Sequence, residues 1–277
     1  MNTFDFNKTR DGGEIIGDTF AYIRLHFSSL GKALLFFVFP FQLIGLFLAQ
    51  DSIGFNFAQI FNPETVDQIS EFFGWQYLAG LLLSTAGSMA MVAVTVRHMY
   101  IVRMGEEPTL AHLAQGLIGT SFGIWGLSLI VGFIIFFGLL LFFIPGVYLG
   151  VKLILANSAY IMEDESVGDA MSSSWEVTKD YWWDTFLIVI VMYILVVVAA
   201  VIVTVPTSIG TLVLSNAGVL ESTAWATPLV NGVASLLGAI GNLFYVILYI
   251  SFTLQYLNLK ERKEGGGLRA KIEALGR

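Results

Sequence analysis

The side chains that most often bind metals are few in this chain and lie far apart. Its three histidines are His26, His98 and His112, and the chain has no cysteine. Zinc and di-iron sites need His, Cys or Glu ligands spaced three or four residues apart on a helix or in a tight loop. No pair of these histidines has that spacing, so we predict no metal site.

The motifs of phosphoryl, acyl and hydride transfer are also absent from the sequence. It has no glycine-rich phosphate loop, no Gly-x-Ser-x-Gly nucleophile elbow and no dinucleotide fingerprint. We therefore predict no catalytic residues, no cofactor and no enzymatic activity.

One ionisable side chain stands out, because Lys152 lies inside a long apolar stretch. A charge within a membrane segment is costly and marks a functional site by default. Two interpretations stay open. Its long stem could carry the ammonium group to the membrane surface, where it would anchor the helix or contact a lipid headgroup. The ammonium group could instead be buried, where it would pair with a partner or line a path.

The composition places this lysine in a membrane. The chain of 277 residues is 56% hydrophobic and only 13% charged, with a mean hydropathy of +0.76, whereas soluble domains are about a quarter charged. The formal net charge is −7 and the basic residues are dispersed. Because phosphate backbones are bound by clustered basic residues, we exclude nucleic acid as a partner and expect the lipid bilayer instead.

Six segments are long and apolar enough to cross a bilayer, which takes about 20 helical residues. The third and fourth are separated by Pro145-Gly146, which we predict to form a tight turn because proline and glycine both interrupt helices. The sequence therefore predicts an all-α polytopic membrane protein of six transmembrane helices in three hairpins. The six segments are residues 33–50, 75–96, 120–143, 147–162, 183–205 and 230–254.

Basic residues predict the orientation, because Lys and Arg in short loops stay in the cytoplasm. With Lys152 as the sole exception, they occur before residue 33, in 97–103, at Lys179 and after residue 259, whereas the connectors 51–74, 144–146 and 206–228 have none. Both termini are therefore predicted to be cytoplasmic. The predicted parts are an N-terminal segment with an interfacial helix (1–32), a six-helix membrane domain (33–259) and a tail with a glycine hinge and a short helix (260–277).

Each hairpin is predicted to follow a short amphipathic helix on the cytoplasmic side. In the first, apolar residues recur at steps of three and four, as on one face of a helix: Ile16, Phe20, Ile23, Phe27 and Leu30. Residues 167–175 repeat the pattern with Val167, Met171 and Trp175, and 108–117 repeat it more weakly. Ser166 is expected to cap the third of these helices, with Asp169 near its positive end.

Small residues at helical spacing inside the spans predict close helix packing. The pairs are Gly80 and Ser84, Gly119 and Gly123, and Ala234 and Gly238, and a further series runs through Gly232, Ser235, Gly238 and Gly241. Three polar residues of the spans, Asn157, Asn242 and Gln255, are predicted to form hydrogen bonds between helices.

The region from Phe143 to Trp183 carries a resemblance to a known family. It contains Phe143-Ile144-Pro145-Gly146-Val147-Tyr148, then Lys152, an acidic turn from Glu163, and an amphipathic helix ending in Ser174-Trp175. In this order the features resemble the membrane domain attached to some bacterial glycerophosphoryl diester phosphodiesterases. The tail after Lys263 is similar to stand-alone relatives from Bacteroidota-type bacteria.

The resemblance implies a helical fold in a bacterial cytoplasmic (inner) membrane and transfers no catalytic residue, because the phosphodiesterase domain itself is absent. It leaves Lys152, Glu163, Ser174 and Trp175 as candidate functional residues. The favoured hypothesis is a membrane scaffold or accessory subunit that binds other membrane proteins, a second copy of itself, or lipid. The alternative is a transporter or channel for a lipid or small amphiphile. An intramembrane enzyme is the least supported.

Overall fold

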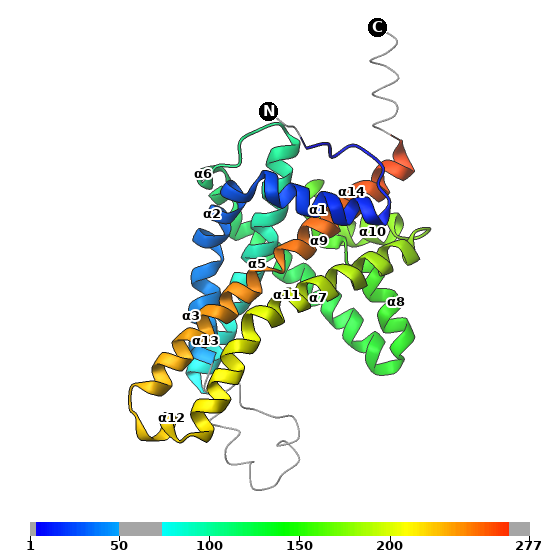
Figure 1. The fold of residues 1–277 in the computed structure, drawn as a ribbon. Coiled ribbons are helices and arrows are strands. Elements are labelled where there is room, and N and C mark those ends of the chain that lie inside the picture. The colour runs from blue at the N-terminus through cyan, green and yellow to red at the C-terminus, as the bar shows by residue number, and fades with distance from the viewer. Residues whose placement is uncertain (1–3, 50–73, 266–277) are drawn as a thin grey trace. The chain divides into compact units, whose positions relative to one another are not determined.

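The computed structural model describes residues 4–49 and 74–265, and within these ranges every regular element is a helix (Figure 1). The elements are α1 (Gly12–Leu25), α2 (Phe27–Phe37), α3 (Phe39–Ala49), α5 (Trp75–Arg103), α6 (Leu110–Ala114), α7 (Leu117–Leu141), α8 (Phe143–Leu153), α9 (Ala156–Met162), α10 (Val167–Val177), α11 (Trp182–Asn216), α12 (Val219–Ser222), α13 (Ala226–Leu243) and α14 (Val246–Glu264).

Five helical stretches of the described chain are long and apolar enough to cross a membrane: α5, α7, α8 with α9, α11, and α13 with α14. A sixth is reached if α2 and α3, bent by 43° at their junction, count as one span. Pro40 lies in the first turn of α3, where a missing amide hydrogen does least harm to a helix. The prediction of an all-α protein is confirmed, with five or six candidate spans.

The turn between the third and fourth predicted spans lies earlier than we predicted. The chain reverses at Phe142, which is extended with φ −155° and ψ 125°, and Pro145 and Gly146 are already inside α8. Proline is compatible with the first turn of a helix. Gly146 instead allows close packing, because a Cβ there would lie 2.5 Å from the Leu139 amide nitrogen on α7. The assignment of Pro145-Gly146 as the turn is therefore wrong.

The fifth predicted span also ends later than we predicted. We expected it to end at Val205, before Pro206, yet α11 continues through this proline to Asn216. Proline is tolerated inside membrane helices when nearby hydroxyl groups re-satisfy the backbone. Around Pro206 four hydroxyl side chains donate to helix carbonyls, namely Thr204, Thr207, Ser208 and Thr211. None of these four donates to the Ile202 carbonyl, which loses its helical donor because Pro206 has no amide hydrogen. Much of the predicted 206–228 connector is therefore helix.

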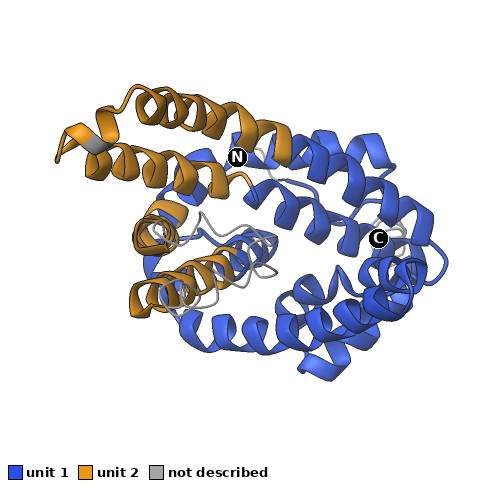
Figure 2. Cartoon of the chain, turned by 90° about the horizontal axis from the view of Figure 1, so that it is seen from below, with its two compact units in different colours: residues 1–33, 92–196, 245–277 blue, residues 34–91, 197–244 orange. Residues whose placement is uncertain are grey.

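The chain divides into two compact units (Figure 2). Unit 1 comprises residues 1–33, 92–196 and 245–277, and unit 2 comprises residues 34–91 and 197–244. In unit 1, α1 packs against α14, α7 against α8, and α9 against α10. In unit 2, α3 packs against α13.

Close backbone contacts hold unit 2 together. A Cβ on Gly45 would lie 2.4 Å from Ser84 Oγ, and one on Gly80 would lie 2.6 Å from the Gly45 oxygen. Such distances are shorter than real side chains permit, so only glycine fits. Gln42 is buried beside this contact, donates to Ser88 Oγ at 3.1 Å, and accepts a hydrogen bond from Asn242 at 3.0 Å.

The predicted packing role of small residues is confirmed at some positions and wrong at others. The prediction of close packing is confirmed for Gly80, where a Cβ would collide with the Gly45 backbone, and for Gly123, where it would collide with Tyr160. Gly238 and Gly241 are in ordinary to tight contact with neighbouring side chains, but Gly119 and Gly232 face open space. The spacing of small residues predicted which of them share a helix face. It did not predict which of them a neighbouring helix contacts.

Helices occur at all three places where short interfacial helices were predicted, as α1, α6 and α10. The buried residues of α1 are Ile15, Thr19 and Tyr22. The predicted apolar face therefore lies beside the side of the helix that is packed, and two of its residues are exposed, Phe20 of α1 by 39% and Phe27 of α2 by 72%.

The connector 51–74 lies, apart from Gly74, outside the described residues, as does the tail beyond Gly265. Gly265 itself has φ 61° and ends α14.

Candidate functional site

Lys152 lies in the last turn of α8, and its side chain is buried, with 1% exposed. Its Nζ donates a hydrogen bond to the backbone oxygen of Trp175 at 3.3 Å. The same atom lies 5.2 Å from the centre of the Trp175 ring and 5.8 Å from that of Tyr148, within reach of cation–π attraction. Of the two interpretations of Lys152, the structure therefore shows the buried cation, and its partner is α10 of the same chain.

The backbone of Lys152 is bound to α10 as well. The last carbonyls of a helix lack intrahelical donors, and α8 ends one residue later. Ser174 Oγ donates to the Lys152 oxygen at 2.8 Å, and Thr178 Oγ1 does so at 3.4 Å. Ser174 and Thr178 are fully buried. Contacts from both the side chain and the main chain of one residue thus attach α10 to the end of α8.

Aromatic side chains enclose this junction on its outer side. Trp182 Nε1 donates to the backbone oxygen of Tyr148 at 3.2 Å, and the two rings stack with their centres 5.8 Å apart. The Trp175 ring meets the Tyr148 ring edge-on at 6.2 Å and remains 39% exposed. We call Lys152, Ser174, Trp175, Tyr148 and Trp182 the α8–α10 junction.

Glu163, the fourth candidate, belongs to a different cluster. Its carboxylate lies 2.7 Å from Lys260 Nζ and 3.8 Å from Arg103 Nη1, which joins the end of α9 to α14 and α5. All three side chains are about a quarter exposed, and exposed ion pairs contribute about 0–1 kcal/mol each. The structure therefore brings three of the four candidates together and places Glu163 elsewhere.

The start of α10 follows the prediction. Ser166 is its N-cap and accepts a hydrogen bond from the Asp169 amide at 3.3 Å, while its hydroxyl donates to the Asp169 carboxylate at 2.6 Å. The acidic side chain thus lies in the first turn, where it is favoured by the helix dipole. Together with the α8–α10 junction, this cap fixes both ends of α10.

The model of one protein family, the membrane domain of glycerophosphoryl diester phosphodiesterase, matches residues 124–273, more than half of the chain. The chain belongs to this family. No curated protein and no solved structure matches it. The predicted resemblance is thereby confirmed, and the chain is a membrane protein.

All four candidate residues lie within the region that matches the glycerophosphoryl diester phosphodiesterase membrane domain, and so does the whole of α14. In this region the α8–α10 junction offers an amine already held by a carbonyl and two rings, and no nucleophile beside a base. No three His, Asp or Glu side chains of the described chain gather as metal ligands do. The arrangement is suited to positioning a helix.

A second buried network, centred on Arg10, lies mostly before the region of the family match, and no sequence pattern predicted it. Arg10 is 1% exposed, and its guanidinium donates to Asp18 Oδ2 at 2.8 Å and to the Lys8 oxygen at 3.1 Å. It also donates to the Phe6 and Asp5 oxygens. Burial alone would raise the pKa of Asp18, but hydrogen bonds and charge from Lys8 and Arg10 outweigh it and lower that pKa.

The same network continues into the membrane helices. The Arg10 amide donates to Asn258 at 2.7 Å, Asn258 donates to Gln255 at 3.1 Å, and Gln255 donates to Thr185 at 3.0 Å. This chain of hydrogen bonds links the segment before α1 to α14 and α11. It confirms the prediction that Gln255 bonds between helices, as Asn242 does in unit 2. For Asn157 the prediction is not met, since its Oδ1 is buried without a partner.

A third polar cluster surrounds His98, which is fully buried. Tyr22 Oη lies 2.7 Å from its Nδ1, and Ser29 Oγ lies 2.9 Å from its Nε2. The His26 ring packs against both Tyr22 and His98. Burial raises the pKa of Tyr22 well above its usual value and lowers the pKa of His26. The histidines are far apart in sequence, so spacing could not reveal this cluster.

Proposed function

We propose that this protein is a non-enzymatic membrane scaffold or accessory subunit that uses α10 to bind another membrane protein. The observation that carries the proposal is the α8–α10 junction. It fixes one side of α10, through the buried Ala170, Ser174 and Val177, and leaves side chains of the opposite side exposed, beside the end of α14. A rigid helix that presents an exposed tryptophan beside charged groups has the composition of a protein interface.

The exposed side of α10 carries the features a partner would recognise. Trp175 is 39% exposed, and Asp169, Ser172 and Glu176 are exposed around it. The helix costs little to order on binding, because Ser166 caps its start and Lys152 holds its last turns. Preorganisation of this kind removes an entropic cost from association.

The distribution of basic residues supports a bacterial inner-membrane location with α10 on the cytoplasmic face. All fourteen Lys and Arg residues belong to unit 1, and residues 34–91 and 197–244 of unit 2 contain none. Under the positive-inside rule, the loops of unit 1 that carry basic residues, both termini and the interfacial helices α1, α6 and α10 face the cytoplasm. Three hairpins, each preceded by one of these helices, complete the proposed layout.

The proposal is tested by copurification in mild detergent from membranes of the native host. The double variant Ser172→Arg, Glu176→Arg changes only the exposed side of α10 and leaves the junction intact. We expect it to lose a partner that wild-type protein retains in fixed stoichiometry. The control is Glu107→Arg, which repeats the charge reversal of Glu176→Arg at another exposed site.

A second variant separates the helix from its anchor. Ser174→Ala removes the hydroxyl that donates to the Lys152 oxygen at 2.8 Å and leaves this oxygen only the longer bond from Thr178 at 3.4 Å, a loss of about 0.5–1.5 kcal/mol. We expect partner retention to fall because α10 is fixed less firmly. If the partner survives in both α10 variants but is lost with Glu107→Arg, the proposed interface is wrong.

One observation favours the alternative, a transporter or channel for a lipid or small amphiphile. The span of α8 and α9 is broken at Ile154–Leu155, and just beyond the break Asn157 Oδ1 is buried without a hydrogen bond. Broken helices with free polar groups form substrate sites in transporters. Flux of a fluorescent lipid or small amphiphile through reconstituted vesicles that disappears in Asn157→Leu would establish this role over the scaffold.

A further inference from the structure

A groove of about 260 Å³ lies in unit 1 between the first turns of α1, the beginning of α11 and the last turns of α14. It is separate from the α8–α10 junction, and its occupancy does not depend on the scaffold role. One wall is aliphatic, with Leu187 and Val191 from α11 opposite Ile16 from α1. At the other end lie Asp184, Asn258 and Arg262.

The aliphatic wall continues into the surface that faces lipid. Leu187 is 57% exposed and Val191 38% exposed. Only 17% of the most apolar window of α11 is buried inside the protein, so this helix offers its apolar side chains to hydrocarbon. A hydrocarbon chain could therefore pass from the bilayer into the groove without leaving apolar surroundings.

The polar side chains on the floor of the groove already form hydrogen bonds within the protein. Asn258 accepts from the Arg10 amide and donates to Gln255, which in turn donates to Thr185. The guanidinium of Arg10 donates to Asp18 and to backbone oxygens. The charged groups that remain for a ligand are those of the rim, Asp184 and Arg262.

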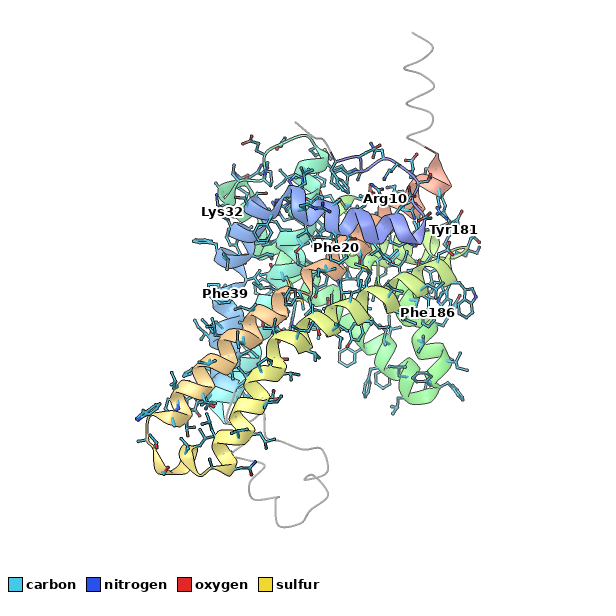
Figure 3. All side chains as sticks on the ribbon, viewed as in Figure 1. Arg10, Phe20, Lys32, Phe39, Tyr181 and Phe186 are labelled. Carbon is cyan, nitrogen blue, oxygen red and sulfur yellow. The ribbon has the colours of Figure 1, made fainter. Side chains whose placement is uncertain are left out.

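The rim pairs one anion with one cation. Asp184 Oδ2 lies 3.7 Å from Arg262 Nη1, which is too long for a hydrogen bond, and the side chains are 58% and 27% exposed. Arg262 is held in place from behind, because it donates to the Arg10 oxygen and lies 5.3 Å from the centre of the Tyr181 ring. Arg10 and Tyr181 lie at the same end of the molecule in Figure 3. Such an exposed ion pair adds little stability, so a ligand can separate it easily.

We propose that this groove binds one zwitterionic phospholipid with a primary ammonium headgroup, such as phosphatidylethanolamine. The phosphate lies on Arg262, which binds phosphate through paired N–H donors. The ammonium group lies on Asp184, and an acyl chain follows Leu187 and Val191 toward the bilayer. A purely anionic lipid has no group for Asp184 and is repelled by it.

The test uses the full chain purified in detergent, with native mass spectrometry to count bound lipids. The probes are dioleoyl phosphatidylethanolamine, dioleoyl phosphatidylglycerol and free phosphoethanolamine. We expect one phosphatidylethanolamine to be retained about tenfold more tightly than phosphatidylglycerol. Asp184→Asn should remove this preference, and Arg262→Gln should weaken both lipids.

The chain supplies a matched control. Lys263 and Asp180 form a second exposed pair at 3.5 Å with side chains 24% and 66% exposed, and neither lines the groove. Asp180→Asn and Lys263→Gln should leave lipid retention unchanged. An equal loss in these controls, or equal retention of the two lipids by wild-type protein, overturns the proposal.

The source of the ligand is decided in the same experiment. Leu187→Ser alters an exposed wall residue and should weaken lipid retention without affecting folding, which is checked by the unfolding temperature. If free phosphoethanolamine displaces the lipid as well as added lipid does, and Leu187→Ser has no effect, the groove binds a soluble zwitterion and the lipid proposal is overturned. The lipid measurement is independent of the copurification experiment, so the loss of a protein partner in the α10 variants does not affect it.

Discussion

All fourteen Lys and Arg residues of the chain lie in unit 1, and unit 2 has none. The contacts differ accordingly. Unit 1 buries Arg10, Lys152 and His98, each surrounded by hydrogen-bond acceptors, hydroxyls or rings. The described part of unit 2 is joined instead by glycines in backbone contact and by an amide pair, Gln42 with Asn242.

The two kinds of contact suit different environments. In hydrocarbon the hydrophobic effect cannot drive helices together, so small residues and a few amides provide close packing and hydrogen bonds. Near the polar boundary of a membrane, the free-energy cost of a buried charge is small when the charge is paired. Such charges can hold loops and short helices in place. The two candidate sites, the α8–α10 junction and the groove, both lie in unit 1.

The largest effect that would test this comparison is expected from Arg10→Ala. Losing the buried guanidinium removes the donor to the Asp5, Phe6 and Lys8 backbone oxygens, at a cost of about 1–3 kcal/mol for each acceptor that stays buried and unpaired, while Asp18 keeps Lys8 as its partner. The free energy of unfolding in mixed micelles measures it. Lys8→Ala is the control, because Lys8 binds the same carboxylate at 2.9 Å but is 35% exposed, and we expect a loss of about 1 kcal/mol or less. Equal losses would mean that buried charge does not hold unit 1 together.

A smaller loss is expected in unit 2 from Gly45→Ala. The added methyl group would collide with Ser84 of α5, and overpacking costs about 1–3 kcal/mol. Gly232→Ala is the control, since nothing lies within 4 Å of a Cβ there and alanine favours a helix by roughly 0.5–1 kcal/mol. Thermal unfolding should therefore move in opposite directions for the two variants. A shift of the same sign would contradict close glycine packing as the basis of unit 2.

The smallest effect concerns pH and should be confined to unit 1. Burial lowers the pKa of His26 below 6.5, so the unfolded state binds the proton more readily. Stability from neutral His26 is therefore complete above pH 6.5 and decreases as the pH falls below that value. We expect the drop in unfolding temperature between pH 7 and pH 5 to be smaller in His26→Gln than in wild-type protein. An unchanged drop would show that His26 is not part of the folded core.

The sequence predicted most of the helices but misjudged where two of them begin or end. Pro145-Gly146 and Pro206 were both interpreted as breaks, yet the structure places them within helices. In each case the tendency of proline and glycine to end a helix was outweighed by the position of the residue within the structure. Pro145 lies in a first turn, where proline is tolerated. Pro206 lies in a membrane helix, where lipid offers the backbone no other hydrogen-bond partners, so the helix continues through the proline.

The candidate site was predicted only in part. Lys152 was identified because a lone charge in an apolar segment is visible in sequence, and Ser174 and Trp175 because of the family resemblance. Arg10 was not identified, because in the sequence it looks like any other basic residue of a cytoplasmic N-terminal segment. Its bond to Asn258 joins residues 248 positions apart, and no spacing pattern reports such a contact.

Composition and order of residues alone determined that this chain belongs in a membrane, that it is helical, and which segments carry positive charge. Those properties depend on each segment's own transfer between water and lipid, which the local sequence fixes. Only the tertiary structure decided that Lys152 is held by α10, that Glu163 is held elsewhere, and that Arg10 lies against α14. These are pairings between distant segments, and they are set by packing and hydrogen bonding in three dimensions.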